Sequence, residues 1–235
     1  MNNESQTTII DAMFKAGAHF GFGRSRRHPS MSPFIFGMKN RVEIFDLEKT
    51  KDLLIRAKEI VRGFGKNGSQ ILFVGGKSEA RQAIRDAADK LRMPYVTGRW
   101  LGGTLTNFKE IRRRIDRLQD LLAERQSGGL VKYTKRERMI IDREIAHLER
   151  FFSGLSLMKE KPNALFVIDP RHEHTAVSEA KKERIPLITL ASSDCQFGDA
   201  NYPIVGNDSS RQSIEFFIKE IVAAYEQGQT EKLKT

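Results

Sequence analysis

The chain has 235 residues, of which 39% are hydrophobic, and its formal net charge at pH 7 is +10. These values indicate one large folded domain, or one domain with an insertion, and they exclude a disordered tail protein. No segment reaches the roughly 18 apolar residues of a membrane span, and the polar N-terminus lacks a secretory signal. The single cysteine, Cys195, excludes an internal disulfide. We expect a cytoplasmic protein whose positive charge attracts polyanions.

The N-terminal part predicts a helix, a basic loop, two strands and a second helix. Apolar residues at helical spacing precede a run of glycines, and Pro29 and Pro33 keep the basic loop that follows from becoming helical. Asp46 stands at the N-cap position of the second helix. The predicted elements are a helix at 8–16, strands at 34–36 and 42–45, and a helix that follows Asp46 and extends to residue 64.

The remainder of the chain, apart from one block, alternates short apolar runs with amphipathic segments. Continuous apolar strands separated by helices are typical of βαβ units with a parallel sheet and right-handed crossovers. We therefore predict an α/β fold with a flavodoxin-like or Rossmann-like three-layer body. The strands are expected at 71–74, 95–96, 164–168, 187–190 and 204–205, and the helices at 78–91, 173–184 and 209–225.

Residues 104–153 interrupt this alternation because they contain no strand signal. Two stretches with apolar residues at three-four spacing flank a glycine break at 127–129, and Thr134 with Glu137 forms a capping box that starts the second stretch. This pattern predicts an antiparallel coiled-coil hairpin inserted into the body. We favour a hairpin that projects over one that covers the sheet. The expected divisions are a body at 1–103 and 154–227, the hairpin at 104–153, and a mobile tail at 228–235.

Two motifs point to ligand chemistry, but each has a simpler interpretation. Residues 75–78 (GGKS) follow a strand and open a helix, yet Ile71 occupies the place of the first P-loop glycine, which leaves an ordinary turn or a phosphate contact. His172 and His174 near Asp169 offer metal ligands, but their spacing does not put them on one helical face. Cys195 has no neighbouring base, so no catalytic thiol is predicted.

Basic residues form three clusters, in the loop before the first strand, along the first hairpin helix, and at the hairpin tip. Arginine pairs with phosphate oxygens and stacks on bases, which favours nucleic acid. The alternative is a solvated charged surface on which acidic residues compensate the arginines. Trp100 is a candidate for base stacking or, equally, for the core. The candidate RNA-binding residues are Arg24, Arg26, Arg27, His28, Lys39, Arg41, Arg99, Trp100, Asn107, Lys109, Arg112, Arg113, Arg114, Arg117, Lys132, Lys135 and Arg136.

An ordered set of motifs between residues 10 and 225 resembles the bacterial type of small-subunit ribosomal protein two. The most specific motif is RWLGGTLTNFK at 99–109. The others are GAHFG at 17–21, PFIFG at 33–37, IFDLEKT at 44–50, ILFVG at 71–75, MPYV at 93–96, PNALFVID at 162–169 and YPIVGND at 202–208. This chain departs from the family pattern at Phe22–Gly23, at Arg27–His28, and at 192–195 (SSDC).

The resemblance implies an α/β body with an inserted hairpin and a place on the solvent side of the small subunit, between head and body. It also implies contacts with small-subunit rRNA and neighbouring ribosomal proteins, including the large mRNA-binding one. No enzymatic activity, cofactor, metal, membrane or small-molecule substrate is expected. A small-molecule enzyme that uses the edge of the sheet, and a free nucleic-acid regulator, are the alternatives. The first lacks its glycine fingerprints and the second lacks a recognition helix.

Overall fold

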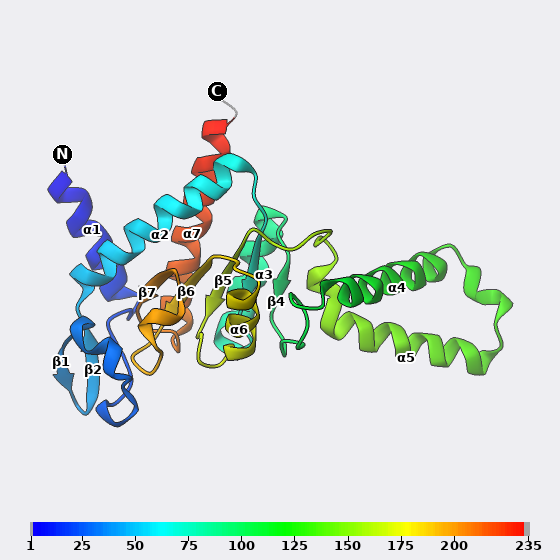
Figure 1. Cartoon of the computed structure of the whole chain (residues 1–235), viewed down its shortest axis with the longest axis horizontal. Coiled ribbons are helices and arrows are strands. Elements are labelled where there is room, and N and C mark those ends of the chain that lie inside the picture. Colours follow the sequence, from blue (N-terminus) through cyan, green and yellow to red (C-terminus); the bar gives the residue numbers. More distant parts are fainter. Residues whose placement is uncertain (1, 233–235) are drawn as a thin grey trace.

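A five-stranded parallel sheet forms the centre of the computed structural model, which describes residues 2–232, with side chains from residue 9 onward (Figure 1). The strand order, β4–β3–β5–β6–β7, is that of a flavodoxin-like doubly wound sheet, so the predicted α/β three-layer body is confirmed. The strands are β3 (Ile71–Val74), β4 (Tyr95–Val96), β5 (Ala164–Ile168), β6 (Leu187–Ala191) and β7 (Tyr202–Val205).

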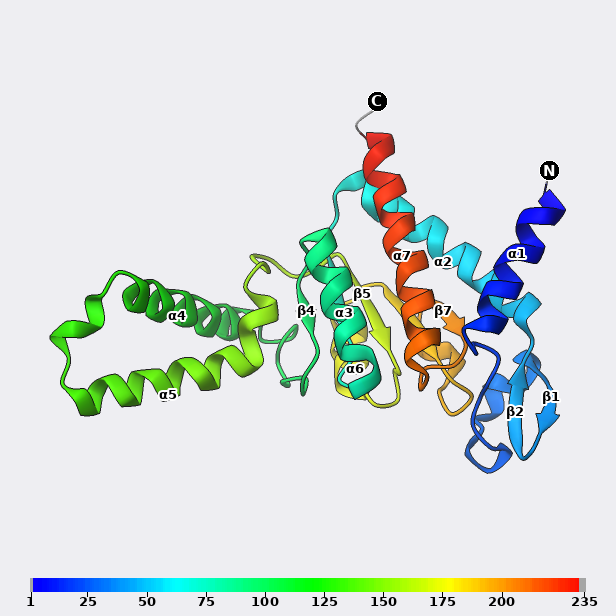
Figure 2. The same ribbon diagram turned by 180° about the vertical axis from the view of Figure 1, so that it is seen from behind.

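Helices cover both faces of the sheet, as the continuous apolar strands require. Successive strand residues point to opposite faces, so Phe73 and Phe166 belong to one core while Leu72 and Val167 belong to the other. None of the described helices has the length and hydropathy of a membrane span. The first core lies under α2 (Leu47–Asn67), α3 (Ser78–Leu91) and α7 (Arg211–Lys232), and the second under α6 (His174–Lys182) and the base of the hairpin (Figure 2).

Helices α2 and α7 approach each other closely because each has a glycine at the contact. A Cβ on Gly65 would lie 2.2 Å from the carbonyl oxygen of Tyr225, and one on Gly228 would lie 2.1 Å from that of Arg62. This packing accompanies an α7 that continues to Lys232, so residues 228–232, which we predicted as part of a mobile tail, are helical. The rest of the predicted tail, residues 233–235, lies outside the described residues.

The N-terminal residues form a separate small lobe beside the edge strand β7. Strands β1 (Ile35–Lys39) and β2 (Val42–Phe45) pair antiparallel, close to the two predicted strands. Asp46 caps α2 as expected, since its carboxylate accepts hydrogen bonds from two free amides in the first turn of the helix. The other elements of this part are α1 (Asn2–Lys15), η1 (Arg24–Arg26) and η2 (Pro29–Phe34), with η5 (Phe197–Asp199) packed against η2.

Residues between β4 and β5 form an antiparallel pair of helices that extends away from the body (Figures 1 and 2). The pair projects, as we favoured, instead of covering the sheet, and the predicted capping box of Thr134 and Glu137 is present. Buried apolar residues run from Ile111 to Leu121 on one helix and from Ile145 to Phe152 on the other, and they continue into the second core. The elements are α4 (Phe108–Gln126), η3 (Gly129–Lys132), α5 (Lys135–Phe152) and η4 (Ser153–Leu155).

Candidate nucleic-acid interface

The first basic cluster lies on the N-terminal lobe, where a tight turn presents two cations. Asn40 and Arg41 connect β1 to β2 with φ values of 51° and 65°, the left-handed conformation of a two-residue type I′ turn. Lys39, Arg41 and the loop residue Arg24 are exposed, and none of them pairs with a carboxylate of a described residue. These three cations are therefore available for phosphate oxygens.

Arg26, Arg27 and His28, in the same cluster, are instead partly engaged within the lobe. The Arg27 guanidinium donates to Glu43 at 3.0 Å, and Glu43 is only 2% exposed, so this pair holds the loop to β2. Arg26 stacks over Phe22 at 4.4 Å and lies 3.9 Å from Asp194. His28 shares a hydrogen bond of 2.8 Å with the Ser30 hydroxyl. The partner of Arg27, Glu43, is 16 positions away in the sequence, so the residues next to Arg27 do not indicate this ion pair.

The loop that carries the RWLGGTLTNFK motif is organised by Glu179, a buried carboxylate on α6. Its two oxygens accept five hydrogen bonds of 2.8 to 3.1 Å, all from this loop. Two of the donors are side chains and three are backbone amides. The donors are the Trp100 indole, the Thr106 hydroxyl and the amides of Gly103, Leu105 and Thr106.

These hydrogen bonds determine both the charge of Glu179 and the place of Trp100. Burial raises the pKa of Glu179, but the hydrogen bonds from Trp100 and the loop amides outweigh burial, so the pKa lies below its ordinary value. Trp100 is 7% exposed and packs in the second core, which is the core alternative left open by the sequence. Its inclusion among the RNA-binding candidates is corrected, because a ring that stacks on a base must be exposed.

Most arginines of the hairpin are paired with nearby carboxylates. This agrees with the alternative interpretation, in which acidic residues compensate the arginines on a solvated surface. Arg113 and Arg114 share Glu110 at 3.5 and 3.7 Å, and Arg117 reaches across to Glu144 on the second helix at 3.0 Å. The other ion pairs among the described hairpin residues are Arg112 with Asp116, Arg125 with Glu149, and Lys132 with Glu124. The candidates on and before the hairpin that have no ion pair with a described residue are Arg99, Lys109, Lys135 and Arg136.

The structure does not bring the three predicted clusters together. The β1–β2 lobe lies at one end of the longest axis of the molecule, and the tip of the hairpin lies at the other (Figure 1). Asn107 is exposed at the start of α4, at the root of the hairpin. Phosphate contacts at both ends would therefore involve well-separated stretches of a nucleic acid.

A buried ion network lies at the carboxyl ends of β3, β5 and β7, close to the two motifs whose sequences suggest phosphate or metal ligands. The Lys77 ammonium lies 2.6 Å from Asp169 and 3.2 Å from Asp208, so it offsets part of the charge of the two carboxylates. Asp169, Cys195 and Asp208 offer atoms within 4.8 Å of one another, but no such group among the described residues includes a histidine. Burial raises the pKa of Asp208 to about 6, against the nearby charge of Lys77.

We expect Asp208→Asn to change how stability depends on pH. Since the folded-state pKa of about 6 exceeds the ordinary value of 3.8, the stabilising contribution is present below 3.8 and is lost as the pH rises through 6. The wild-type protein should therefore lose stability relative to the variant mainly between about pH 4 and pH 6.5, as measured by urea denaturation, and the difference should level off above that range. Asp199→Asn, at a more exposed ion pair with Lys181, is the control. Parallel pH profiles for wild type and Asp208→Asn would contradict the assignment.

Comparison with known proteins identifies the family. A family model described as Ribosomal protein S2 matches residues 13–228. The chain belongs to the ribosomal protein S2 family. The small ribosomal subunit protein uS2 of Rhodopirellula baltica is 39% identical over 227 residues, covering 95% of this chain and 87% of that protein. The uS2 protein of Nitratiruptor sp. is 41% identical, covering 92% and 81%, and that of Salinispora tropica is 41% identical, covering 92% and 74%.

Membership in the ribosomal protein S2 family confirms the resemblance that the motifs indicated. The family is a structural one, so the prediction of a ribosomal protein without enzymatic activity is confirmed. Glu179, which organises the most specific motif of the chain, was not among the residues predicted from the sequence. Its signal was an acidic residue beside Ala176, Val177 and Ala180 on the apolar face of a helix, where only a satisfied carboxylate is tolerated.

Proposed function

We propose that this protein is a structural constituent of the small ribosomal subunit in the cytoplasm and binds small-subunit rRNA through phosphate contacts. The supporting observation is a set of exposed cations at both ends of a non-enzymatic protein of the ribosomal protein S2 family, none of which forms an ion pair with a described residue. Phosphate contacts position a protein on RNA without reading its sequence. The cations that carry this proposal are Arg24, Lys39, Arg41, Arg99, Lys109, Lys135 and Arg136.

We further propose that neighbouring ribosomal proteins, including the large mRNA-binding one, are partners. Exposed apolar side chains support protein contacts on the N-terminal lobe, where Phe36 is 81% exposed and Met38 is 60% exposed. Residues 104–153 act in this proposal as an inserted unit whose tip reaches RNA or protein beyond the body. The paired arginines of the hairpin remain candidates for RNA binding. A surface ion pair contributes little net free energy, so an RNA phosphate can replace the carboxylate as the partner of the arginine.

Charge reversal on the lobe tests the RNA contacts. We expect Arg24→Glu with Arg41→Glu to weaken association with small subunits. The slope of log affinity against log salt concentration should become shallower by about one for each phosphate that the variant no longer neutralises. Arg27 is avoided, because a carboxylate there would face the buried Glu43. The measurement is sedimentation of a tagged copy from cell lysate through sucrose gradients at several salt concentrations.

The matched control is Arg56→Glu with Lys66→Glu, which changes the charge equally on the exposed side of α2. Wild type should travel with small subunits at low salt and be released as salt rises. If wild type stays at the top of the gradient at every salt concentration, the proposed function is wrong. If the lobe variant behaves as wild type does, the lobe is removed from the RNA-binding surface.

A further inference from the structure

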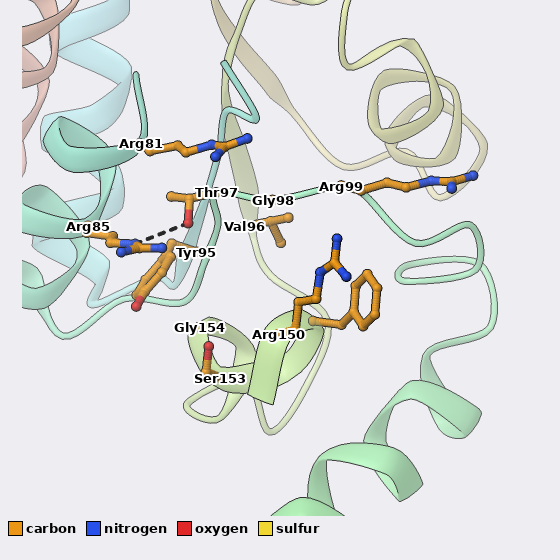
Figure 3. A pocket seen from close by; sticks show the side chains of 11 residues that line it. Arg81, Arg85, Tyr95, Val96, Thr97, Gly98, Arg99, Arg150, Ser153 and Gly154 are labelled. Atoms are coloured by element: carbon orange, nitrogen blue, oxygen red, sulfur yellow. Dashed lines mark hydrogen bonds between the residues drawn. The ribbon is translucent and has the colours of Figure 1, made fainter. Parts of the chain in front are cut away.

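Four arginines from three separate elements surround one cavity at the root of the hairpin, which we call the root cavity. It has a volume of about 580 Å³ and lies between α3, the end of β4 and the end of α5. Arg81 and Arg85 approach it from α3 and Arg150 from the hairpin side, while the guanidinium of Arg99 points outward at the rim (Figure 3). Of these four, only Arg99 was a candidate from the sequence.

The charge of the root cavity is unbalanced, unlike that of the hairpin surface. None of its four arginines pairs with a carboxylate of a described residue, whereas Arg113, Arg114 and Arg117 on α4 all do. The Nε of Arg81 donates to the Gly76 carbonyl at 3.1 Å, and the Nε of Arg85 donates to the Thr97 hydroxyl at 3.3 Å. These bonds position both side chains and leave their terminal nitrogens for an anion.

The neighbouring cavity helps to define which anion fits. It has a volume of about 610 Å³, shares Arg81 and Arg99 with the root cavity, and lies at the carboxyl ends of β3 and β5. Doubly wound sheets bind ligands at this switch point, where the strand order reverses. Here, however, the Gly76 amide donates to Glu173 at 2.9 Å, and the same carboxylate oxygen lies 2.8 Å from His172 Nδ1.

The Glu173 carboxylate thus occupies the position at the switch point where the phosphate of a nucleotide would have to bind. The sequence is compatible with a phosphate contact at residues 75–78, but in the structure the Gly76 amide already donates to Glu173 and is not available to a phosphate. The open, cationic site is displaced toward the hairpin, where all four arginine side chains are exposed to solvent. An exposed arginine site suits a phosphate that belongs to a larger ligand, because the rest of that ligand can extend across the surface.

We propose that the root cavity is a phosphate-binding site that takes a phosphodiester group of RNA, an inference that rests on the proposed function. Arg81 and Arg150 approach the phosphate from the body and from the hairpin, and each guanidinium donates to its oxygens. One phosphate therefore links α3 to α5 and holds the hairpin at a defined angle to the sheet. The same arginines could also bind free phosphate, and the test below distinguishes free phosphate from an RNA phosphodiester.

The first arm of the test uses the purified full chain and inorganic pyrophosphate, measured by isothermal titration calorimetry at low ionic strength. We expect Arg81→Gln with Arg150→Gln to weaken binding about tenfold or more, since neither side chain can then donate a charged pair of hydrogen bonds. Arg56→Gln with Lys66→Gln removes the same charge elsewhere and should bind as wild type does. Thermal melts by circular dichroism establish that the variants fold.

The second arm places the same variants in competition with wild type for incorporation into small subunits. Loss of pyrophosphate binding together with reduced incorporation supports the RNA phosphodiester. Loss of pyrophosphate binding with normal incorporation overturns RNA as the source and leaves a site for free phosphate. If neither property changes, the root cavity is not a phosphate site, although the proposed function stands while wild type is incorporated. If wild type itself is not incorporated, the proposed function fails and the calorimetry alone decides the cavity.

Discussion

Replacing Glu179 with alanine is expected to lower the free energy of unfolding by about 3 kcal/mol, because several buried donors lose their acceptor at once. Alanine is a better helix former than glutamate, so any loss of stability arises from the loop and not from α6. The Trp100 indole and the amides of Gly103 and Leu105 would have to find water inside the second core. Urea denaturation of both proteins measures the difference.

The pH dependence of this effect is a second readout of the same variant. Since the folded-state pKa of Glu179 lies below its ordinary value of 4.5, its stabilisation is present at neutral pH and is lost as the pH falls below 4.5. The gap between wild type and Glu179→Ala should therefore narrow in acid. Glu183→Ala, which removes only a surface pair with Lys161, should cost less than about 1 kcal/mol. A Glu179→Ala variant as stable as that control would show that the loop donors have other partners.

Two glycines on one helix should respond to alanine with opposite signs. We expect Gly65→Ala to destabilise the protein by about 2 to 3 kcal/mol, because the new Cβ overlaps the backbone of α7. The overlap is with the Tyr225 carbonyl at 2.2 Å, and backbone cannot move as a side-chain end can. In Gly63→Ala the new Cβ meets no atom of a described residue within 4 Å, and the substitution should stabilise α2 by about 0.5 to 1 kcal/mol through helix propensity.

Thermal and urea denaturation of the two single variants check this prediction. Gly63 and Gly65 lie in the same helix, so the pair separates the packing effect from the propensity effect. If Gly65→Ala were as stable as wild type, α2 and α7 would not be packed as closely as Gly65 and Gly228 indicate. Equal destabilisation by both variants would instead point to a general cost of changes in α2.

The regular part of the fold was predictable in detail because its signals are local. Strand β3 and helix α3 begin and end at the predicted residues, 71–74 and 78–91, since a buried strand and an amphipathic helix each show their own periodicity. The N-cap Asp46 and the Thr134 capping box were equally local. The end of α7 was not predictable, because the packing of Gly228 on α2 extends it into a polar stretch.

The candidate interface was predictable only in part, since a basic residue in a sequence does not show its partner. The pairs of Arg113 and Arg114 with Glu110 follow from helical spacing. The contact of Arg117 with Glu144, in contrast, depends on the register between two helices. Trp100 could not be placed from its neighbours, because its hydrogen-bond acceptor, Glu179, is 79 positions away.

The α/β class, the inserted helical pair and the family could be predicted from the sequence alone, because periodicity and ordered motifs are properties of neighbouring residues. Which cations lack an ion pair among the described residues depends on the tertiary structure, because ion pairing depends on distances between residues that are far apart in the chain. The tertiary structure buries Trp100 and pairs Arg27 with Glu43. It also brings Arg81 and Arg150 to one cavity, where neither pairs with a carboxylate of a described residue.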